Sequence, residues 1–342
     1  MTVLTFGESL LRLSPPEHQR FVQADRFDAE FGGSEANVAV ALSRYGMESR
    51  FVTKLPENPL GQAAINYLRR YGVDTEAIVR GGARMGKYFL ETGAAQRGSM
   101  VLYDRADAAI TTLTPDELSL KELLEDAVWV HWSGITPALG EVPHRTVEVI
   151  CRTAQEAGVT VSCDLNFREK LWSEAEAQRV MVPLMEYVDV CMSGRGDPFS
   201  TLSLEDPQSG PPSIEVDEAA YIEVAHTMKK QFDFKAVALT LRESWSASMN
   251  GLSALLLDEA DCQGGYRSQR YEMDLVDRVG GGDAFSAGLI YGLLKHESSR
   301  EALEFAVAAS CLKHTIPGDT NLATREEVEA LADDVGLGGV SR

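Results

Sequence analysis

The sequence is poor in basic residues for its length: 32 lysines and arginines stand against 52 aspartates and glutamates, and the formal net charge is −20. An acidic surface repels phosphate backbones and anionic lipid headgroups, because such partners bind through clustered positive charge. We therefore expect no nucleic-acid partner and no membrane-surface partner. An anionic small molecule would need a local group of arginines.

Long apolar runs are also missing. No stretch approaches ~20 uninterrupted apolar residues, and the first residues lack a charged start followed by an apolar run of ~7–15 residues. We therefore expect neither a membrane span nor a signal peptide, and we expect a cytoplasmic protein.

Paired cysteine motifs are the third absence. The five cysteines are scattered and show no CxxC spacing. An odd number of scattered cysteines disfavours a disulfide framework or a zinc site. Reduced, mostly buried thiols are the expected state.

From about residue 128 onward, short β-rich segments alternate with stretches of helical periodicity. "VWVHWSGI" and "VTVSCDLN" flank an amphipathic run from Pro143 to Ala157. Strand, helix and strand at this spacing require right-handed crossovers, so the pattern predicts an α/β fold with a mostly parallel sheet and helices on both faces. In such sheets ligands bind beyond the carboxyl ends of the strands.

The first hundred residues read differently. Segments at about 11–31 and 84–107 have strand-like composition with Gly, Pro and Asp punctuation and little helical period. We predict that they form a small β-sheet inserted into a single domain spanning residues 1–342.

The stretch "VDRVGGGDAFSAG", residues 276–288, places three glycines directly before a helical pattern. Glycines at that position leave backbone amides bare, and the helix dipole adds about half a positive charge, so an anion is the expected guest. Asp283 then falls in the first turn, where it either caps amides or faces the same guest. The spacing is neither GxGxxG nor a Walker loop. From this stretch alone, an ordinary glycine-rich turn remains an alternative.

Two segments carry a family resemblance. "DRVGGGDAFSAG" resembles the DTxGAGDxFxxG signature of the ribokinase-like (PfkB) sugar kinases, and "FGGSEANVAVALSRYG", residues 31–46, resembles their GGxxxNxAxxxxxLG signature. "GKYFLETG", "VLYDR", "DLNFREKLW", "LTLRESWSASMNG" and "KHTIPGD" are similar to the 2-keto-3-deoxygluconate kinase branch. The resemblance runs from Phe6 to beyond Asp319.

The resemblance implies a ribokinase-like three-layer sandwich with a small β-sheet lid. It also implies ATP-dependent phosphorylation of a sugar acid, with 2-keto-3-deoxygluconate as substrate and its 6-phosphate as product. Asp283 would be the general base for the primary hydroxyl of the sugar, and Gly280, Gly281 and Gly282, with the amide of Asp283, would form the anion hole.

By the same resemblance, several residues would contact the sugar: Gly33, Asn37, Tyr88, Tyr103, Arg105, Arg168 and Asp319. Tyr103 and Arg105 are two residues apart and would project from one face of a strand. Arg105 and Arg168 together suit a carboxylate, which takes bidentate guanidinium bonds. Each arginine taken singly is more often a solvated surface charge than a ligand for an anion.

The resemblance assigns the nucleotide to a second group: Asn166, Ser193, Thr240, Arg242, Ser244 and Ser246. It implies ATP and Mg²⁺ as cofactors and admits a monovalent cation such as K⁺. Relatives carry TxGxxG where this chain has Arg242 and Trp245 in place of glycines. They also carry NxxE where this chain reads "SGRGD", which leaves Asp197 as the candidate for a water-mediated metal contact and predicts weaker magnesium organisation.

Two alternatives stay open. The substrate could be another sugar, namely fructose, ribose or keto-deoxy-galactonate, or the chain could be a catalytically weakened sugar-binding relative. The "SGRGD" segment favours the last, and the intact Asp283 and glycines oppose it. Phe21, Phe27, Tyr88, Phe89 and Leu90 crowd a segment too short to bury them, so we also predict a homodimer joined through the two lids.

Overall fold

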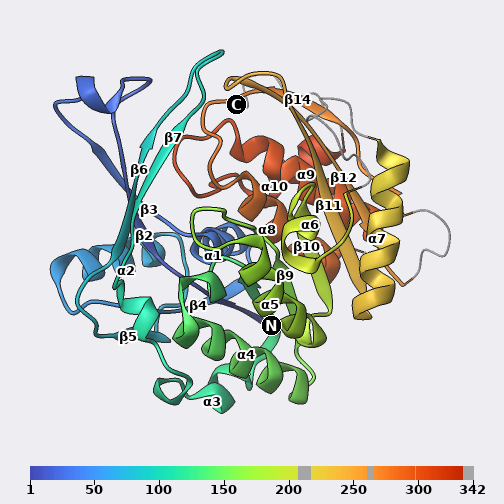
Figure 1. Ribbon diagram of the computed structural model, residues 1–342, viewed down its shortest axis with the longest axis horizontal. Helices are drawn as coiled ribbons and strands as arrows, with labels where there is room; N and C mark the ends of the chain where they lie inside the picture. The colour runs from blue at the N-terminus through green and yellow to red at the C-terminus, as the bar shows by residue number, and fades with distance from the viewer. Residues whose placement is uncertain (207–216, 260–264, 297, 334–342) are drawn as a thin grey trace.

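The computed structural model describes residues 1–206, 217–259, 265–296 and 298–333. A mixed sheet of ten strands in this part of the chain has the order β13-β12-β11-β10-β9-β8-β1-β4-β5, with β14 paired to β12 (Figure 1). The strands are β1 (Thr2–Phe6), β4 (Glu48–Leu55), β5 (Ile78–Arg80), β8 (Ala127–Ser133), β9 (Thr160–Asp164), β10 (Val190–Gly194), β11 (Ala236–Ser244), β12 (Met249–Leu257), β13 (Tyr266–Arg267) and β14 (Tyr271–Asp274). From β5 to β11 neighbouring strands are parallel, and β12 pairs antiparallel with β11, β13 and β14.

Helices cover both faces of this sheet. They are α1 (Ser34–Arg44), α2 (Pro59–Arg70), α3 (Leu120–Leu124), α4 (Glu141–Glu156), α5 (Glu174–Leu184), α6 (Asp197–Leu202), α7 (Glu218–Phe232), α8 (Gly281–Lys295), α9 (Ser299–Lys313) and α10 (Arg325–Ala332). Side chains alternate along the strands, so Cys191 and Val237 pack with α4, α5 and α7, whereas Met192 and Ala238 pack with α1, α8 and α9. The predicted α/β architecture is confirmed.

The start of α8 differs from the starts of α9 and α10. Ser298 and Thr324 cap α9 and α10, and each side chain accepts a hydrogen bond from a first-turn amide. The residue before α8 is Gly280, which has a left-handed backbone and no side chain to offer. The first amides of α8 are therefore left for another partner.

A separate four-stranded sheet, here called the small sheet, stands beside the main body on the left of Figure 1. It is built from β2 (Leu10–Ser14), β3 (Asp28–Gly32), β6 (Gly86–Glu91) and β7 (Met100–Asp104), in the order β3-β2-β6-β7. Leu10, Tyr88 and Leu90 form a small buried cluster on it. Phe21, Phe27 and Phe89 pack ring against ring, with centroids 5.9 to 6.5 Å apart.

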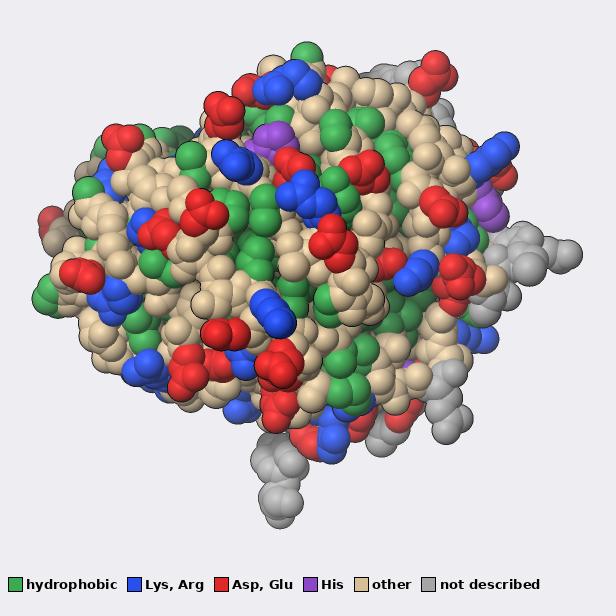
Figure 2. All heavy atoms as spheres, turned by 90° about the horizontal axis from the view of Figure 1, so that it is seen from below, with side chains coloured by type: hydrophobic (Ala, Val, Ile, Leu, Met, Phe, Trp, Pro, Cys, Tyr) green, Lys and Arg blue, Asp and Glu red, His purple; other side chains and the backbone are tan. Residues whose placement is uncertain are grey.

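Cysteines and surface charge complete the description. Cys151, Cys163, Cys191 and Cys311 are buried and free, and Cys262 lies outside the described residues. Figure 2 shows the face at the bottom of Figure 1, where acidic and basic side chains are interspersed. No helix in the described ranges is both long enough and apolar enough to cross a membrane.

Candidate active site

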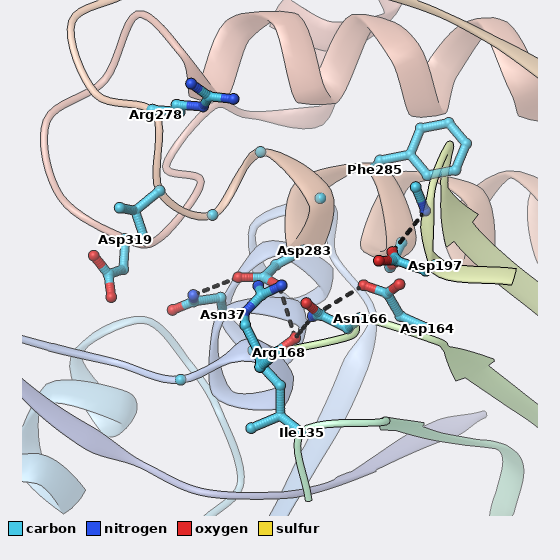
Figure 3. A pocket seen from close by; sticks show the side chains of 18 of the residues that line it. Asn37, Ile135, Asp164, Asn166, Arg168, Asp197, Arg278, Asp283, Phe285 and Asp319 are labelled. Carbon is cyan, nitrogen blue, oxygen red and sulfur yellow. Dashed lines mark hydrogen bonds between the residues drawn. The ribbon is translucent and has the colours of Figure 1, made fainter. Parts of the chain in front are cut away.

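A cavity of about 580 Å³ opens where β9, β10 and β11 end, beside the start of α8 and the small sheet (Figure 3). This is the edge at which parallel sheets bind ligands. Most of the sequence-predicted residues line it: Gly33, Asn37, Tyr88, Tyr103, Arg105, Asn166, Arg168, Ser193, Asp197, Thr240, Arg242, Gly280, Gly281, Gly282, Asp283 and Asp319. Segments from both ends of the chain thus meet in one cavity.

Each of the three glycines before Asp283 has its own reason to be a glycine. A Cβ on Gly280 would lie 1.8 Å from the carbonyl oxygen of Asp319, and its φ is +81°. A Cβ on Gly281 would lie 2.3 Å from the ring of His314. A Cβ on Gly282 would meet nothing within 4 Å. Gly280 and Gly281 are therefore fixed by packing beneath the turn, while Gly282 faces open space where a ligand can approach the amides.

Asp283 connects the two signature segments. Its Oδ1 accepts a hydrogen bond from Ser34 Oγ at 2.7 Å, and its Oδ2 accepts one from Asn37 Nδ2 at 2.6 Å. Burial raises the pKa of this carboxyl, and the bonds from Asn37 and Ser34 lower it in part. The carboxylate is buried, oriented by neutral donors and adjacent to the cavity.

Sequence reasoning did not identify Asp164, which lines the same cavity as Asp283. Asn166 Nδ2 donates to Asp164 Oδ2 at 3.2 Å and to Ser34 Oγ at 3.3 Å, and Ser34 in turn donates to Asp283. Asn166 has a φ of +40°, which asparagine tolerates better than most residues. Burial, with the nearby Asp197 and Asp283, holds the pKa of Asp164 well above its usual range. A carboxylate at the end of a buried strand, two residues before Asn166, was the available signal.

The small sheet supplies one end of the cavity. The rings of Tyr88 and Tyr103 lie 6.0 Å apart, and the Arg105 guanidinium lies 4.5 Å from the centre of the Tyr103 ring. Strand β7 ends one residue before Arg105. The side chains of Tyr103 and Arg105 nevertheless both face the cavity, as the two-residue spacing predicts. The Nε of Arg105 lies 3.5 Å from Glu8 Oε2.

Arg168 lies close to the carboxylates of Asp283, Asp164 and Asp197. Its Nη1 donates to the Phe167 carbonyl at 2.9 Å, and Figure 3 shows its side chain beside Asp283. Its charge lowers the pKa values of Asp283, Asp164 and Asp197, against the larger effect of burial. The guanidinium therefore offsets part of the negative charge at the base of the cavity.

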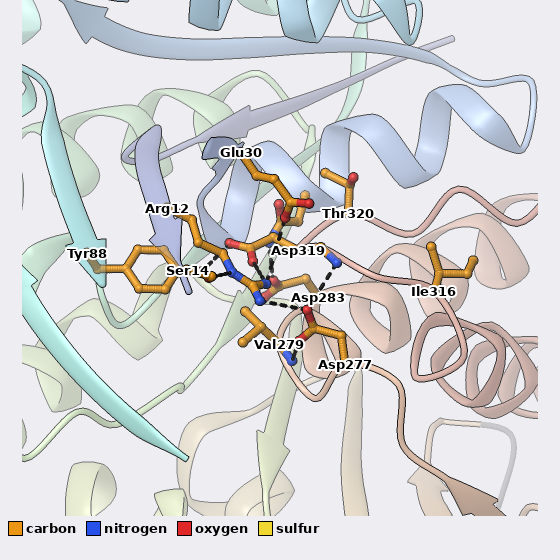
Figure 4. Close-up of polar contacts among 12 residues, drawn as sticks. Arg12, Ser14, Glu30, Tyr88, Asp277, Val279, Asp283, Ile316, Asp319 and Thr320 are labelled. Carbon is orange, nitrogen blue, oxygen red and sulfur yellow. Dashed lines mark hydrogen bonds and ion pairs between the residues drawn. The ribbon is translucent and has the colours of Figure 1, made fainter. Parts of the chain in front are cut away.

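Asp319 lines the cavity, but its carboxylate already has protein partners (Figure 4). Oδ1 accepts from Arg12 Nη1 at 2.7 Å, and Oδ2 accepts from the Tyr88 hydroxyl at 2.5 Å. Arg12 also pairs with Asp277 Oδ2 at 2.8 Å. Asp277 accepts from the amides of Val279 and Gly318 at 3.0 Å each, so this ion cluster ties the small sheet to the glycine turn.

The other end of the cavity holds residues assigned to the nucleotide. Thr240 Oγ1 donates to the Ser193 carbonyl at 3.3 Å, and Arg242 Nη2 lies 3.1 Å from His314 Nε2. Because His314 Nδ1 donates to the Ser310 carbonyl at 2.6 Å, its Nε2 is the acceptor for Arg242. Burial lowers the pKa of His314 to about 3, and burial, with Arg278 nearby, lowers the pKa of Arg242 to about 10.

Two predicted nucleotide residues are not brought to the cavity. Ser244 is exposed at the end of β11, and Ser246 lies in the turn that follows, where its hydroxyl accepts from the amides of Ser248 and Met249. Neither lines the cavity. Arg278, which the sequence reasoning did not single out, lines it instead and lies above the glycine turn in Figure 3.

The donors available to a metal ion are few. Asp197 lines the cavity together with Asp164, and its Oδ2 accepts from the Gly194 amide at 3.1 Å. No cluster of three or more His, Cys, Asp or Glu side chains suited to a metal occurs within the described ranges. This donor set fits Mg²⁺ that keeps its water ligands and is held mainly by phosphate oxygens.

Comparison with known proteins agrees with this geometry. A family model described as pfkB family carbohydrate kinase matches residues 2–325. The crystal structure of a 2-dehydro-3-deoxygluconokinase from Thermotoga maritima superposes with a TM-score of 0.92 at 48% identity, covering 97% of this chain and 98% of that one. A 2-dehydro-3-deoxygalactonokinase from Haloferax volcanii is 37% identical over 327 residues, 96% of this chain and 95% of its own length. A 2-dehydro-3-deoxygluconokinase from Bacillus subtilis is 28% identical over 331 residues, 96% of this chain and 94% of its own.

Proposed function

Because this chain belongs to the PfkB family of carbohydrate kinases, we propose that the sugar it phosphorylates is an acid, 2-keto-3-deoxygluconate, converted to the 6-phosphate. The observation that carries the proposal is the layout of one cavity. A buried carboxylate and a bare glycine turn lie at its centre, and Arg105 stands over Tyr103 on the small sheet. The Thermotoga and Bacillus relatives are named for this substrate, which is 2-dehydro-3-deoxygluconate in their names.

In this proposal Asp283 is the general base. The primary hydroxyl of the sugar gives its proton to the carboxylate as its oxygen attacks the γ-phosphorus of ATP, and ADP leaves. Ser34 and Asn37 hold the carboxylate at the start of α8, so the acceptor is already oriented. The amides of Gly280, Gly281, Gly282 and Asp283 are assigned to the transferred phosphoryl group, where positioned donors offset the developing charge.

The remaining charge of the nucleotide is assigned to the other end of the cavity. Arg242, oriented by His314, and Thr240 lie where the phosphates of ATP would extend from the glycine turn. Mg²⁺ bound to ATP would supply further neutralisation of the phosphates. Asp197 is our candidate for contacting it through water, with Asp164 beside it.

Arg105 and Arg168 are assigned to the carboxylate of the sugar. An acid gains bidentate hydrogen bonds from a guanidinium that a neutral sugar cannot use. The epimer 2-keto-3-deoxygalactonate is the second candidate substrate, since the Haloferax relative is named for it.

An assay that couples ADP release to a colour change, run over both keto-deoxy acids, fructose and ribose, tests the proposal. The highest kcat/KM should belong to one of the two acids, and a neutral sugar in first place would contradict the assignment. Asp283→Asn should lower kcat by ~100-fold or more on that substrate, the usual scale for a positioned base. Turnover within about threefold of wild type would remove Asp283 from the role. No turnover on any of these sugars would favour the weakened relative.

We also propose that the small sheet acts as a lid that keeps water from the phosphoryl group, and that two lids pair in a homodimer. Leu102 on β7 is 51% exposed, Met100 on the same strand is exposed, and so is Phe27, which directly precedes β3. Sedimentation should show a dimer at micromolar concentration, and Leu102→Asp should split it and raise the KM for the sugar. Leu60→Asp is a matched control, because Leu60 is 53% exposed on α2, outside the small sheet. A monomeric wild type with full activity would contradict the proposal.

A further inference from the structure

Two buried glutamates, Glu8 and Glu35, differ in their hydrogen bonds. Glu35 Oε1 accepts three hydrogen bonds, from the Ser133 amide at 2.9 Å, the Ser133 hydroxyl at 2.8 Å and the Thr136 hydroxyl at 2.8 Å. Among the described residues, neither oxygen of Glu8 accepts a hydrogen bond, although the side chain is only 4% exposed. Glu35 is therefore explained by its packing, and Glu8 is not.

The surroundings of Glu8 point to one partner. Its Oε2 lies 3.5 Å from Nε of Arg105, whose own Nε has no hydrogen-bond acceptor in the described structure. Arg84 contributes a weaker attraction and Glu35 a repulsion. Strand β6 begins with glycine at the point of contact, because a Cβ on Gly86 would lie 2.2 Å from Glu8 Oε1. The chain thus leaves room for a carboxylate behind the arginine.

Arg105 is confined between this carboxylate and an aromatic ring. The Tyr103 ring lies 4.5 Å from its guanidinium carbon, and Glu8 lies at its Nε. Arg105 lines the cavity, whereas Glu8 does not. A long side chain that is held along its stem loses less entropy when its terminal nitrogens bind a ligand.

We propose that Glu8 is a positioning residue for Arg105, holding the guanidinium so that its terminal nitrogens face the carboxylate of an anionic sugar. Glu8 acts through Arg105 and touches no substrate. Its contribution is to the affinity and selectivity for acids and leaves the phosphoryl-transfer step unchanged. This inference rests on the proposed function, because it needs Arg105 to bind the acid.

A double-mutant cycle on the full-length enzyme tests it, with 2-keto-3-deoxygluconate as substrate, at pH 8, above the value of about 7 to which burial raises the pKa of Glu8. Arg105→Ala should raise the KM for the acid by ~30-fold or more, as expected when one side of a charge pair is lost. Glu8→Gln, which keeps the shape and removes the charge, should raise it by ~10-fold, the scale on which outer-shell partners act, with kcat and the KM for ATP unchanged. The double variant should be no worse than Arg105→Ala alone, because Glu8 acts only through Arg105.

Glu35→Gln is the matched control, since it alters a second buried glutamate, whose hydrogen bonds go to Ser133 and Thr136 and not to Arg105. It should lower the Tm and leave the KM for the acid as in wild type. Glu8→Leu, an apolar replacement, carries the same test if the glutamine variant does not fold.

The outcomes separate the two proposals. An Arg105→Ala variant with wild-type KM for the acid would overturn the sugar-acid assignment itself. A large effect of Arg105→Ala without any effect of Glu8→Gln, or fully additive effects of the two, would overturn the role of Glu8 alone.

Discussion

Arg12 lies on strand β2 of the small sheet and Arg105 directly follows its strand β7. Their side chains are 5% and 10% exposed, yet their contacts differ. Arg12 makes close ion pairs with Asp319 at 2.7 Å and Asp277 at 2.8 Å, and its Nε donates to Ser14 at 2.8 Å. Arg105 meets Glu8 at 3.5 Å without a hydrogen bond. A buried guanidinium whose nitrogens are all used fixes the chain around it. A guanidinium that faces a cavity and has few protein partners can still bind an anion there.

The consequence of the Arg12 pairing lies in the glycine turn. Asp277 accepts the amides of Val279 and Gly318, and the carbonyl of Asp319 packs where a Cβ of Gly280 would be. Neutralising both carboxylates lets these segments approach each other in a buried place, which unpaired charges would prevent. Arg12 is thus part of what shapes the turn in front of Asp283.

Replacing each arginine in turn should show this difference. The Arg12 variant should lose more of its free energy of unfolding than the Arg105 variant. We expect Arg12→Met to lower the free energy of unfolding by ~3–5 kcal/mol, because Asp277 and Asp319 would stay buried without their cation. Arg105→Met should cost less than about 1 kcal/mol at pH 7, since Glu8 can take up a proton when its partner is lost. Urea unfolding of the two variants beside wild type measures both values. Equal losses would show that the two arginines share one structural role.

The sequence was sufficient for those parts of the molecule that local pattern determines. The strand and helix alternation after residue 128 predicted the parallel sheet with two helical layers, and the fold is confirmed. Asn37 and Asp283, 246 residues apart, were assigned to one site through the resemblance of two signature segments to the PfkB family, and their side chains are hydrogen-bonded in the structure. Each signature is a contiguous segment that opens a helix, and so it can be recognised from local sequence.

Arg12, Asp277 and Glu8 could not be recognised from local pattern, because their role depends on distant partners. Arg12 meets Asp319 across 307 positions of sequence, and nothing in "LLRLS" marks the arginine as buried. Ser244 and Ser246 were assigned to the nucleotide by position in the TxGxxG motif, whose glycines are replaced in this chain by Arg242 and Trp245. In the structure, both serines lie at the turn between β11 and β12, away from the cavity. Asp319 was predicted as a sugar contact, and the sequence did not reveal that Arg12 and Tyr88 also hold its carboxylate.

The pH dependence of stability tests the pairing of Glu8 with Arg105, and its expected effect is smaller than that of Arg12→Met. Burial raises the pKa of Glu8 to about 7, against the attraction of Arg105 and Arg84 and with repulsion from Glu35. The folded protein therefore keeps a proton on Glu8 between about pH 4.5 and 7, where the unfolded chain loses it. Wild type consequently loses stability through this group as the pH rises across that window, and the loss is constant above it.

Glu8→Gln cannot ionise and should escape this loss. Its stability relative to wild type should be similar at pH 4.5 and should improve as the pH rises to 8. The improvement should be at most ~3.5 kcal/mol, which is ~1.4 kcal/mol for each of the ~2.5 pK units between 4.5 and about 7. Comparing the two proteins at each pH cancels the titration of every other group, including His131 and His314, whose pKa values burial lowers to about 3. Thermal unfolding at pH 4.5, 6 and 8 provides the measurement. A difference that does not change with pH would mean that Glu8 is ionised throughout, and so paired with Arg105 as tightly as Asp277 and Asp319 are with Arg12.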